Sequence, residues 1–113
     1  MKRIILLLSV LSLSGCVNPY TYREDQKIEA SFTTTKSVKD TQECILAAWQ
    51  RVPLLTAISA QQTGKYHSVL AAGDNVDVYT DNGMTVVNYY SLRGAIDVMN
   101  GKEKRIVGIK SCL

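Results

Sequence analysis

The chain has 113 residues and carries 13 lysines and arginines against 10 aspartates and glutamates. This length is enough for one small domain. The near balance of charge gives no basic surface of the kind that binds nucleic acid, and no run of cations that would bind lipid headgroups.

The first residues form an apolar segment behind a basic start. Lys2 and Arg3 precede the apolar run 4–13, which is interrupted only by Ser9 and Ser12. A run of about ten residues is too short to span a bilayer, which needs about 20. The basic start, the short apolar run and the small residues that follow it together predict a secretory signal peptide.

This segment closes on Leu13-Ser14-Gly15-Cys16, which resembles the lipobox of bacterial lipoproteins. In that family the cysteine sulfur receives a diacylglyceryl group, cleavage follows just before the cysteine, and the new amine is acylated. The resemblance implies cleavage between Gly15 and Cys16, and a lipid anchor on Cys16. Aspartate after the cysteine favours the inner membrane in that family, so Val17 implies an outer-membrane protein facing the periplasm. The alternative is an ordinary secretory signal with a chance cysteine.

These motifs divide the chain into a signal peptide (1–15), a lipidated cysteine with a tether (16–27) and one α+β domain (28–113). Removing the first 15 of the 113 residues leaves 98, with 11 of the 13 basic residues against 10 acidic ones. The tether is polar, and its composition favours a disordered linker. Extended at about 3.3 Å per residue, it would reach roughly 35 Å. A second possibility is that Tyr20 and Tyr22 lie at the membrane interface.

The first element expected in the domain is a strand over residues 28–35. Its side chains alternate between two faces, which is typical of a strand that is buried on one side. The face expected to meet the core carries Ile28, Ala30, Phe32 and Thr34.

The strongest helix pattern covers residues 38–52. Ser37 is a suitable N-cap, Asp40 suits the positive end of the helix, and Pro53 ends it. Cys44 lies next to an apolar stripe with spacings of three and four residues, formed by Val38, Thr41, Ile45, Ala48, Trp49 and Val52.

Residues 54–63 are ambiguous, because they could form a short helix or an irregular run that ends in a turn at 61–64. Residues 65–92 predict an antiparallel meander of three strands. Its strands are expected near residues 66–72, 76–80 and 84–91, with a turn at Gly73-Asp74-Asn75 between the first two.

The Asn82-Gly83 pair is the strongest hairpin signal in the chain. A two-residue loop there places Val78 opposite Val87 and Val76 opposite Tyr89, on the face expected to meet helix 38–52. The opposite face would carry Tyr66, Tyr79 and Tyr90, either open to a protein or glycan partner or covered by the C-terminal segment.

Residues 93–113 carry weaker signals. Ile106, Ile109 and Leu113 fall on one side at helical spacing, whereas alternation along the same segment would suit a strand and Gly108 disfavours a helix. We favour a C-terminal helix.

With Cys16 assigned to lipid, Cys44 and Cys112 remain of the three cysteines. A cysteine pair in an exported chain usually forms a disulfide, which here would join the two helices. Two free thiols are the alternative. A metal site is not expected, because zinc sites usually need four ligands and His67 is the only histidine.

The predicted fold is therefore α+β, in the order β-α-β-β-β-α. A four-stranded antiparallel sheet would pack its helices on one face, with Cys44 joined to Cys112.

No catalytic residue and no cofactor is expected. His67 has no partner at a useful spacing, and the sequence contains no nucleophile elbow, phosphate loop or metal cluster. The first hypothesis for function is a lipid-anchored domain that binds another envelope component, most simply a protein. The second is an inhibitor or exclusion factor directed at a hydrolase or a surface receptor, as in phage- or plasmid-borne lipoproteins. An enzyme is the least favoured hypothesis, and a deep pocket around His67 would revive it.

Overall fold

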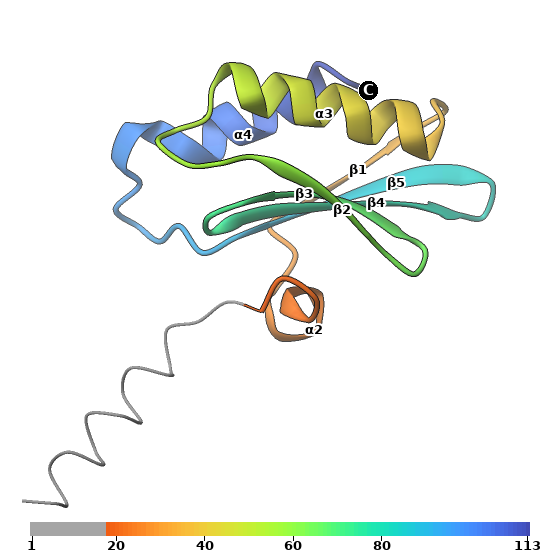
Figure 1. Cartoon of the computed structure of the whole chain (residues 1–113), viewed down its shortest axis with the longest axis horizontal. Coiled ribbons are helices and arrows are strands. Elements are labelled where there is room, and N and C mark those ends of the chain that lie inside the picture. Colours follow the sequence, from red (N-terminus) through yellow and green to blue (C-terminus); the bar gives the residue numbers. More distant parts are fainter. Residues whose placement is uncertain (1–17) are drawn as a thin grey trace, which may run out of the picture.

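A five-stranded antiparallel sheet, with α3 and α4 on one face and α2 on the other, organises the computed structural model, which describes residues 18–113 (Figure 1). The predicted signal peptide and the predicted cleavage site between Gly15 and Cys16 lie outside the described residues. The elements in chain order are α2 (Tyr22–Asp25), β1 (Ala30–Thr34), α3 (Val38–Arg51), β2 (Ser59–Thr63), β3 (Tyr66–Ala71), β4 (Asp74–Asp81), β5 (Met84–Ser91), the 3-10 helix η1 (Val98–Asn100) and α4 (Gly101–Lys110).

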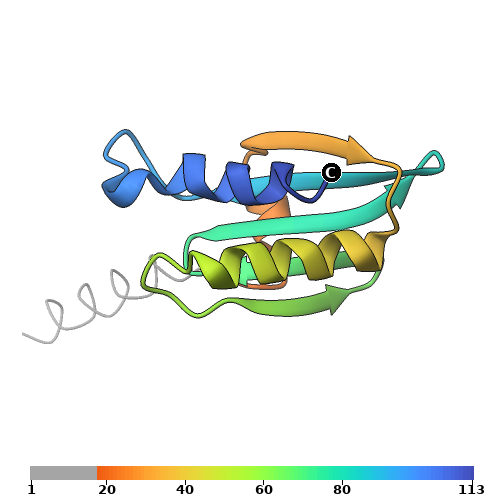
Figure 2. The same ribbon diagram turned by 90° about the horizontal axis from the view of Figure 1, so that it is seen from above.

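The strands are ordered β1-β5-β4-β3-β2, and every neighbouring pair is antiparallel. Seen from above, α3 and α4 lie side by side across the sheet (Figure 2). None of the helices within residues 18–113 is long and apolar enough to cross a membrane. The α+β class and the packing of the expected helices on one face are confirmed.

Helix α3 begins as the sequence predicts. The Ser37 side chain accepts a hydrogen bond from the backbone N–H of Asp40 at 3.1 Å, which satisfies one of the free donors at the helix start. The helix ends at Arg51, two residues before Pro53. Its inward face buries Thr41, Ile45, Ala48 and Trp49.

The register of the β4–β5 hairpin also agrees with the prediction. Asn82 and Gly83 have φ angles of +50° and +76°, as a two-residue hairpin loop with both residues in the left-handed region requires. Val78 pairs with Val87 and Val76 pairs with Tyr89. All four are buried in the core against α3, together with Ile45 and Trp49.

The structure contains one strand more than expected. Residues 59–63 form β2 and pair with β3, so the irregular run or short helix considered for residues 54–63 is wrong there. The turn falls at Gly64-Lys65 rather than at 61–64. β2 is an edge strand and has no apolar face, so its sequence shows no alternation of apolar and polar residues. It is a strand because its backbone pairs with β3.

The β3–β4 connection is also tighter than predicted. Asp74 pairs with Ala71 within the ladder, so the loop consists of Ala72 and Gly73 alone. The second strand of the meander therefore begins at Asp74 and not near Val76.

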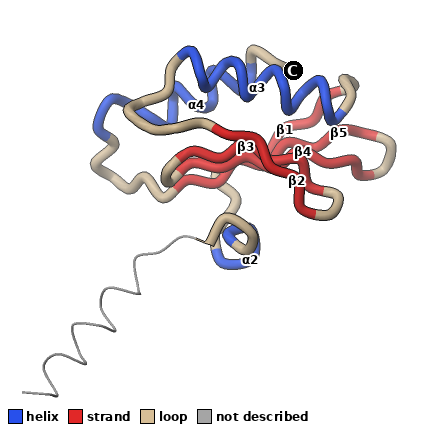
Figure 3. Tube along the Cα trace, in the orientation of Figure 1, coloured by secondary structure: helices blue, strands red, loops and turns tan. Residues whose placement is uncertain are grey.

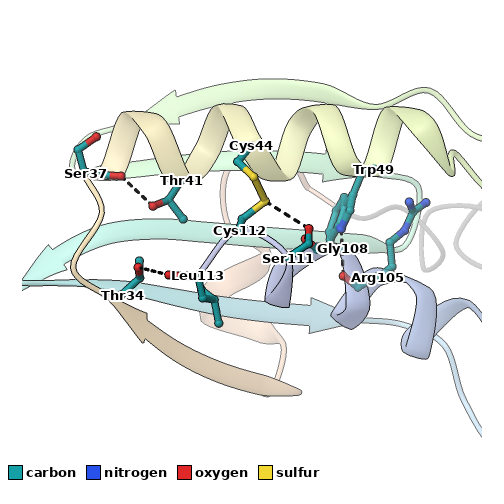
Figure 4. The surroundings of a disulfide bond; sticks show 10 residues. All are labelled: Thr34, Ser37, Thr41, Cys44, Trp49, Arg105, Gly108, Ser111, Cys112 and Leu113. Atoms are coloured by element: carbon teal, nitrogen blue, oxygen red, sulfur yellow. Dashed lines mark hydrogen bonds between the residues drawn. A yellow bond between two sulfur atoms is a disulfide. The ribbon is translucent and has the colours of Figure 1, made fainter.

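The C-terminal helix is confirmed as α4, and the Cys44–Cys112 disulfide ties it to α3 (Figure 4). Gly108 permits this packing, because a Cβ atom there would lie 3.0 Å from Cδ1 of Trp49. The residue that weakens the helix signal in the sequence is thus the one that allows the two helices to approach closely.

The sheet face opposite α3 and α4 is covered by α2 (Figure 3). The Tyr22 side chain is 1% exposed, and its ring meets that of Tyr90 edge-on at 5.5 Å. Its hydroxyl donates to Asp77, while Arg23 Nε donates to the same carboxylate at 2.7 Å. The Arg23 guanidinium also stacks over Tyr66 at 4.4 Å. Around Tyr90 and Asp77 this face is therefore covered by α2, and not by the C-terminal segment.

This packing corrects the expected tether. Residues 22–25 form a helical turn that packs on the sheet. The Tyr22 ring and the Arg23 guanidinium contact side chains of β3, β4 and β5, which are far away in the sequence. Tyr22 is in the core of the domain and not at a membrane interface. Burial, reinforced by the bond to Asp77, raises the pKa of Tyr22, so its phenol stays neutral and donates.

Tyr22→Phe is expected to lower the free energy of unfolding by about 1.5–3 kcal/mol, because it removes a buried hydrogen bond to a charged group. Chemical denaturation followed by circular dichroism measures this change. Tyr20→Phe is the matched control, since Tyr20 is 61% exposed. Equal stability of the two variants would contradict a structural role for the Tyr22 hydroxyl.

Candidate functional site

The structure shows the surroundings of the cysteine pair and of His67, which the sequence marks as candidate site residues. Cys44 and Cys112 are joined, whereas His67 lies half-buried in β3 and makes no side-chain hydrogen bond to another residue within the described part of the chain. No group of three or more His, Cys, Asp or Glu side chains that could hold a metal occurs among residues 18–113.

Exposed aliphatic side chains gather at one end of the molecule. Two segments lie at this end, the loop between α3 and β2 and the segment between β5 and α4 (Figures 1 and 2). Leu55 is 91% exposed and Ile96 is 88% exposed. We call this surface the apolar end, and it comprises Val52, Leu55, Leu92, Ile96, Val98, Met99 and Val107.

A hollow of about 390 Å³ opens within the apolar end, between the end of α3 and the first turns of α4. It is lined by Val52, Asn100, Glu103, Lys104 and Val107. His67 is not among these residues, so this hollow does not surround the histidine.

Both segments of the apolar end contain left-handed backbone at residues other than glycine. Leu54 and Leu55 have φ angles of +56° and +63°, and Met99 and Asn100 have +68° and +56°. Such conformations cost about 1–3 kcal/mol each and persist only where the surrounding structure enforces them. The backbone at Leu55 and Met99 is therefore held in this conformation by interactions of the two segments with the rest of the domain.

Two arginines link both segments to Asp74, which is fully buried at the start of β4. Its carboxylate accepts hydrogen bonds from the Tyr89 hydroxyl at 2.7 Å and the Ser91 hydroxyl at 2.8 Å. Arg93 Nε lies 2.9 Å from Oδ2 of the carboxylate, and Arg105 Nε lies 3.4 Å from the same oxygen. One buried anion thus pairs with two arginines.

Arg105 holds the first segment of the apolar end. It is 1% exposed, and its terminal nitrogens donate to the carbonyls of Val52 at 3.0 Å and Pro53 at 2.9 Å. Its guanidinium lies 4.7 Å from the centre of the Trp49 ring. Burial lowers the pKa of Arg105, and Asp74 opposes this effect. These two hydrogen bonds hold the backbone that directly follows α3.

Arg93 holds the second segment. Its Nη1 lies 3.3 Å from Asp97 Oδ1, and the Asp97 carboxylate accepts the backbone N–H groups of Gly101 and Lys102, each at 2.9 Å. The Lys102 N–H holds the pKa of Asp97 below its usual value, with further lowering by the Gly101 N–H and Arg93. A Cβ atom on Gly101 would lie 2.3 Å from Cζ of Arg93, so glycine leaves room for this arginine.

Sequence reasoning missed this network. Asp74 was interpreted as turn chemistry, and neither Arg93 nor Arg105 stood out. One signal was present, since Arg105 is four residues before Ile109 and therefore occupies a position on the buried stripe of α4. A charged residue in an apolar stripe indicates a buried partner.

Comparison with models of known protein families gives no match for this chain, and neither do comparisons with curated proteins or with solved structures. The apolar end thus combines exposed aliphatic side chains with a buried ion network that is bonded to the segments carrying them.

Proposed function

We propose that this chain is a lipoprotein of the bacterial outer membrane. It is anchored through Cys16, and its disulfide-stapled periplasmic domain binds another envelope component through the apolar end. The observation that supports binding to an envelope component is the apolar end itself. Several exposed apolar side chains gathered at one end of a domain are typical of an interaction site.

Cysteine use supports the anchor. Of the three cysteines in the chain, two are consumed by the Cys44–Cys112 disulfide, which is a bond that persists in oxidising compartments. Cys16 is the remaining one, and it is the residue at which the lipobox resemblance places the lipid. Export and lipidation are thus supported by different residues of the same chain.

Cys16→Ala is expected to move the protein from the membrane fraction to the soluble or precursor fraction, because the acyl chains provide the attachment. Fractionation of cells that express each form, with detection of the chain by antibody, measures this change. The same cells can carry a photoreactive residue at position 55, which should form an adduct with an envelope component only when Cys16 is intact.

A photoreactive residue at position 84 is the matched control for the adduct. Met84 is a partly exposed apolar residue in the β4–β5 hairpin, at the other end of the sheet from the apolar end (Figure 1). Membrane retention of Cys16→Ala would overturn the anchor. Equal adducts from positions 55 and 84 would overturn the apolar end as the binding surface.

A further inference from the structure

We propose that the apolar end inserts into the bilayer that holds the lipid anchor, so that the domain has a second, protein-borne membrane contact and a defined orientation. This inference rests on the proposed function, because it takes Cys16 as the anchored residue. The envelope component that contacts the apolar end would then be the lipid bilayer itself.

The chemistry of the surface favours lipid over a protein partner. Its seven side chains are all aliphatic or thioether, and none is aromatic. Protein interfaces concentrate their binding energy in tryptophan, tyrosine and arginine, with leucine and valine under-represented. The most exposed members, Leu55 and Ile96, project from two separate segments, and acyl chains can surround projecting groups without the shape complementarity that a protein surface would need.

The fixed start of the chain brings the domain to the membrane. The backbone N–H of Tyr22 donates to the carbonyl of Asn18 at 3.1 Å, and Gln61 donates to the carbonyl of Pro19 at 2.8 Å. Only Val17 therefore separates Cys16 from chain that is held on the domain. Two residue steps span about 7 Å when extended, which leaves the domain no room to stand away from the headgroups.

The same contact ties the chain start to the strand that leads away from the apolar end. Gln61 belongs to β2, which is the strand that follows directly from the loop carrying Leu55. Tyr20, next to Pro19, is 61% exposed, and an amphipathic ring of this kind is favoured at a membrane interface. Tyr20 and Leu55 would then mark two points of the membrane-facing surface.

The charges at this end are compatible with an anionic bilayer. Arg93 pairs with Asp97, and Lys102 pairs with Glu29 at 3.1 Å. The other charged side chains here are the cations of Arg51, beside Val52, and of Lys104, which lines the hollow with Glu103. Two cations against one carboxylate leave this end without a negative charge that acidic headgroups would repel.

The test places a fluorescent reporter at each end of the lipidated, full-length mature protein. Leu55→Trp and Met84→Trp variants are added to vesicles of phosphatidylethanolamine and phosphatidylglycerol, with or without lipids that carry a doxyl quencher on the acyl chain. The buried Trp49 gives the same background in both. The added emission at position 55 should shift to the blue and be lost in doxyl vesicles, while that at position 84 should be unchanged.

Ile96→Trp supplies a second reporter, on the other segment of the apolar end, in case position 55 is perturbed. If neither reporter is quenched more than position 84 while the protein stays with the vesicles, the insertion is overturned and the anchor stands. If the protein does not stay with the vesicles, the anchor itself fails. A position-55 reporter that is unquenched by lipid but forms an adduct with an envelope protein in cells assigns the apolar end to a protein partner, and also overturns the insertion.

Discussion

Asp74→Ala is expected to lower the free energy of unfolding by about 3–5 kcal/mol, which is the usual cost of removing one partner from a buried ion pair. The loss is large because Arg105 is almost fully buried and would keep its charge without the anion that balances it. The hydroxyls of Tyr89 and Ser91 would lose their acceptor at the same time.

Urea denaturation of the wild type and the variant, followed by circular dichroism, measures this change. Asp81→Ala is the matched control, because Asp81 is an exposed aspartate at the other end of the same strand. A change below about 1 kcal/mol for Asp74→Ala would mean that the network contributes no more than a surface ion pair does.

The same variant should also loosen the apolar end before the rest of the domain. Arg105 and Arg93 would lose the anion that orients them, and the carbonyls of Val52 and Pro53 and the segment around Asp97 depend on these two side chains. Amide hydrogen exchange should therefore rise most in residues 52–58 and 92–100. Uniform exchange across the sheet would show that Asp74 stabilises the domain as a whole without positioning these segments.

Removing the disulfide with the double variant Cys44→Ala/Cys112→Ala is expected to cost about 4 kcal/mol, from the chain-entropy model for a loop of this size. The two cysteines are 68 residues apart, so the cross-link restricts most of the unfolded domain. Stability of this order is a large share of what a domain of fewer than 100 residues possesses. We expect α4 to separate from α3 at a lower denaturant concentration than in the wild type.

Thermal or urea unfolding of the double variant, compared with the wild type with and without reductant, tests this expectation. Both cysteines are replaced together so that no free thiol can exchange with another cysteine. An unchanged midpoint in the double variant would show that the packing of Trp49 against α4, including its hydrogen bond to the Arg105 carbonyl at 3.2 Å, suffices to hold the two helices together.

Local signals in the sequence account for the parts of the fold that were predicted correctly. The Asn82-Gly83 turn sets the register of β4 and β5 because its two residues adopt the left-handed backbone that a hairpin needs. Ser37, Pro53 and the apolar stripe between them predict α3. Cys44 and Cys112, which remain once Cys16 is assigned to lipid, predict the disulfide. Each of these depends on residues close together in the chain, or on chemistry that only one pair can supply.

The features that were missed depend on contacts between distant residues. Tyr22 finds Asp77 at a separation of 55 residues, and nothing in the polar segment around Tyr22 marks that partner. β2 has no apolar face and is defined by its neighbour. Asp74 pairs with Arg105 across 31 residues, so the network under the apolar end becomes visible only when the sheet and α4 are placed together.

The ion network also affects the entropy of any contact that the apolar end makes. Flexible loops lose conformational freedom when they dock, at about 0.5–1.5 kcal/mol for each side chain that is immobilised. Here the backbone on either side of the apolar end is already bonded when the domain folds, because Arg105 holds the carbonyls of Val52 and Pro53 and Arg93 holds Asp97. The ordering is completed during folding, so the surface is preorganised and keeps more of the favourable free energy of burying its side chains.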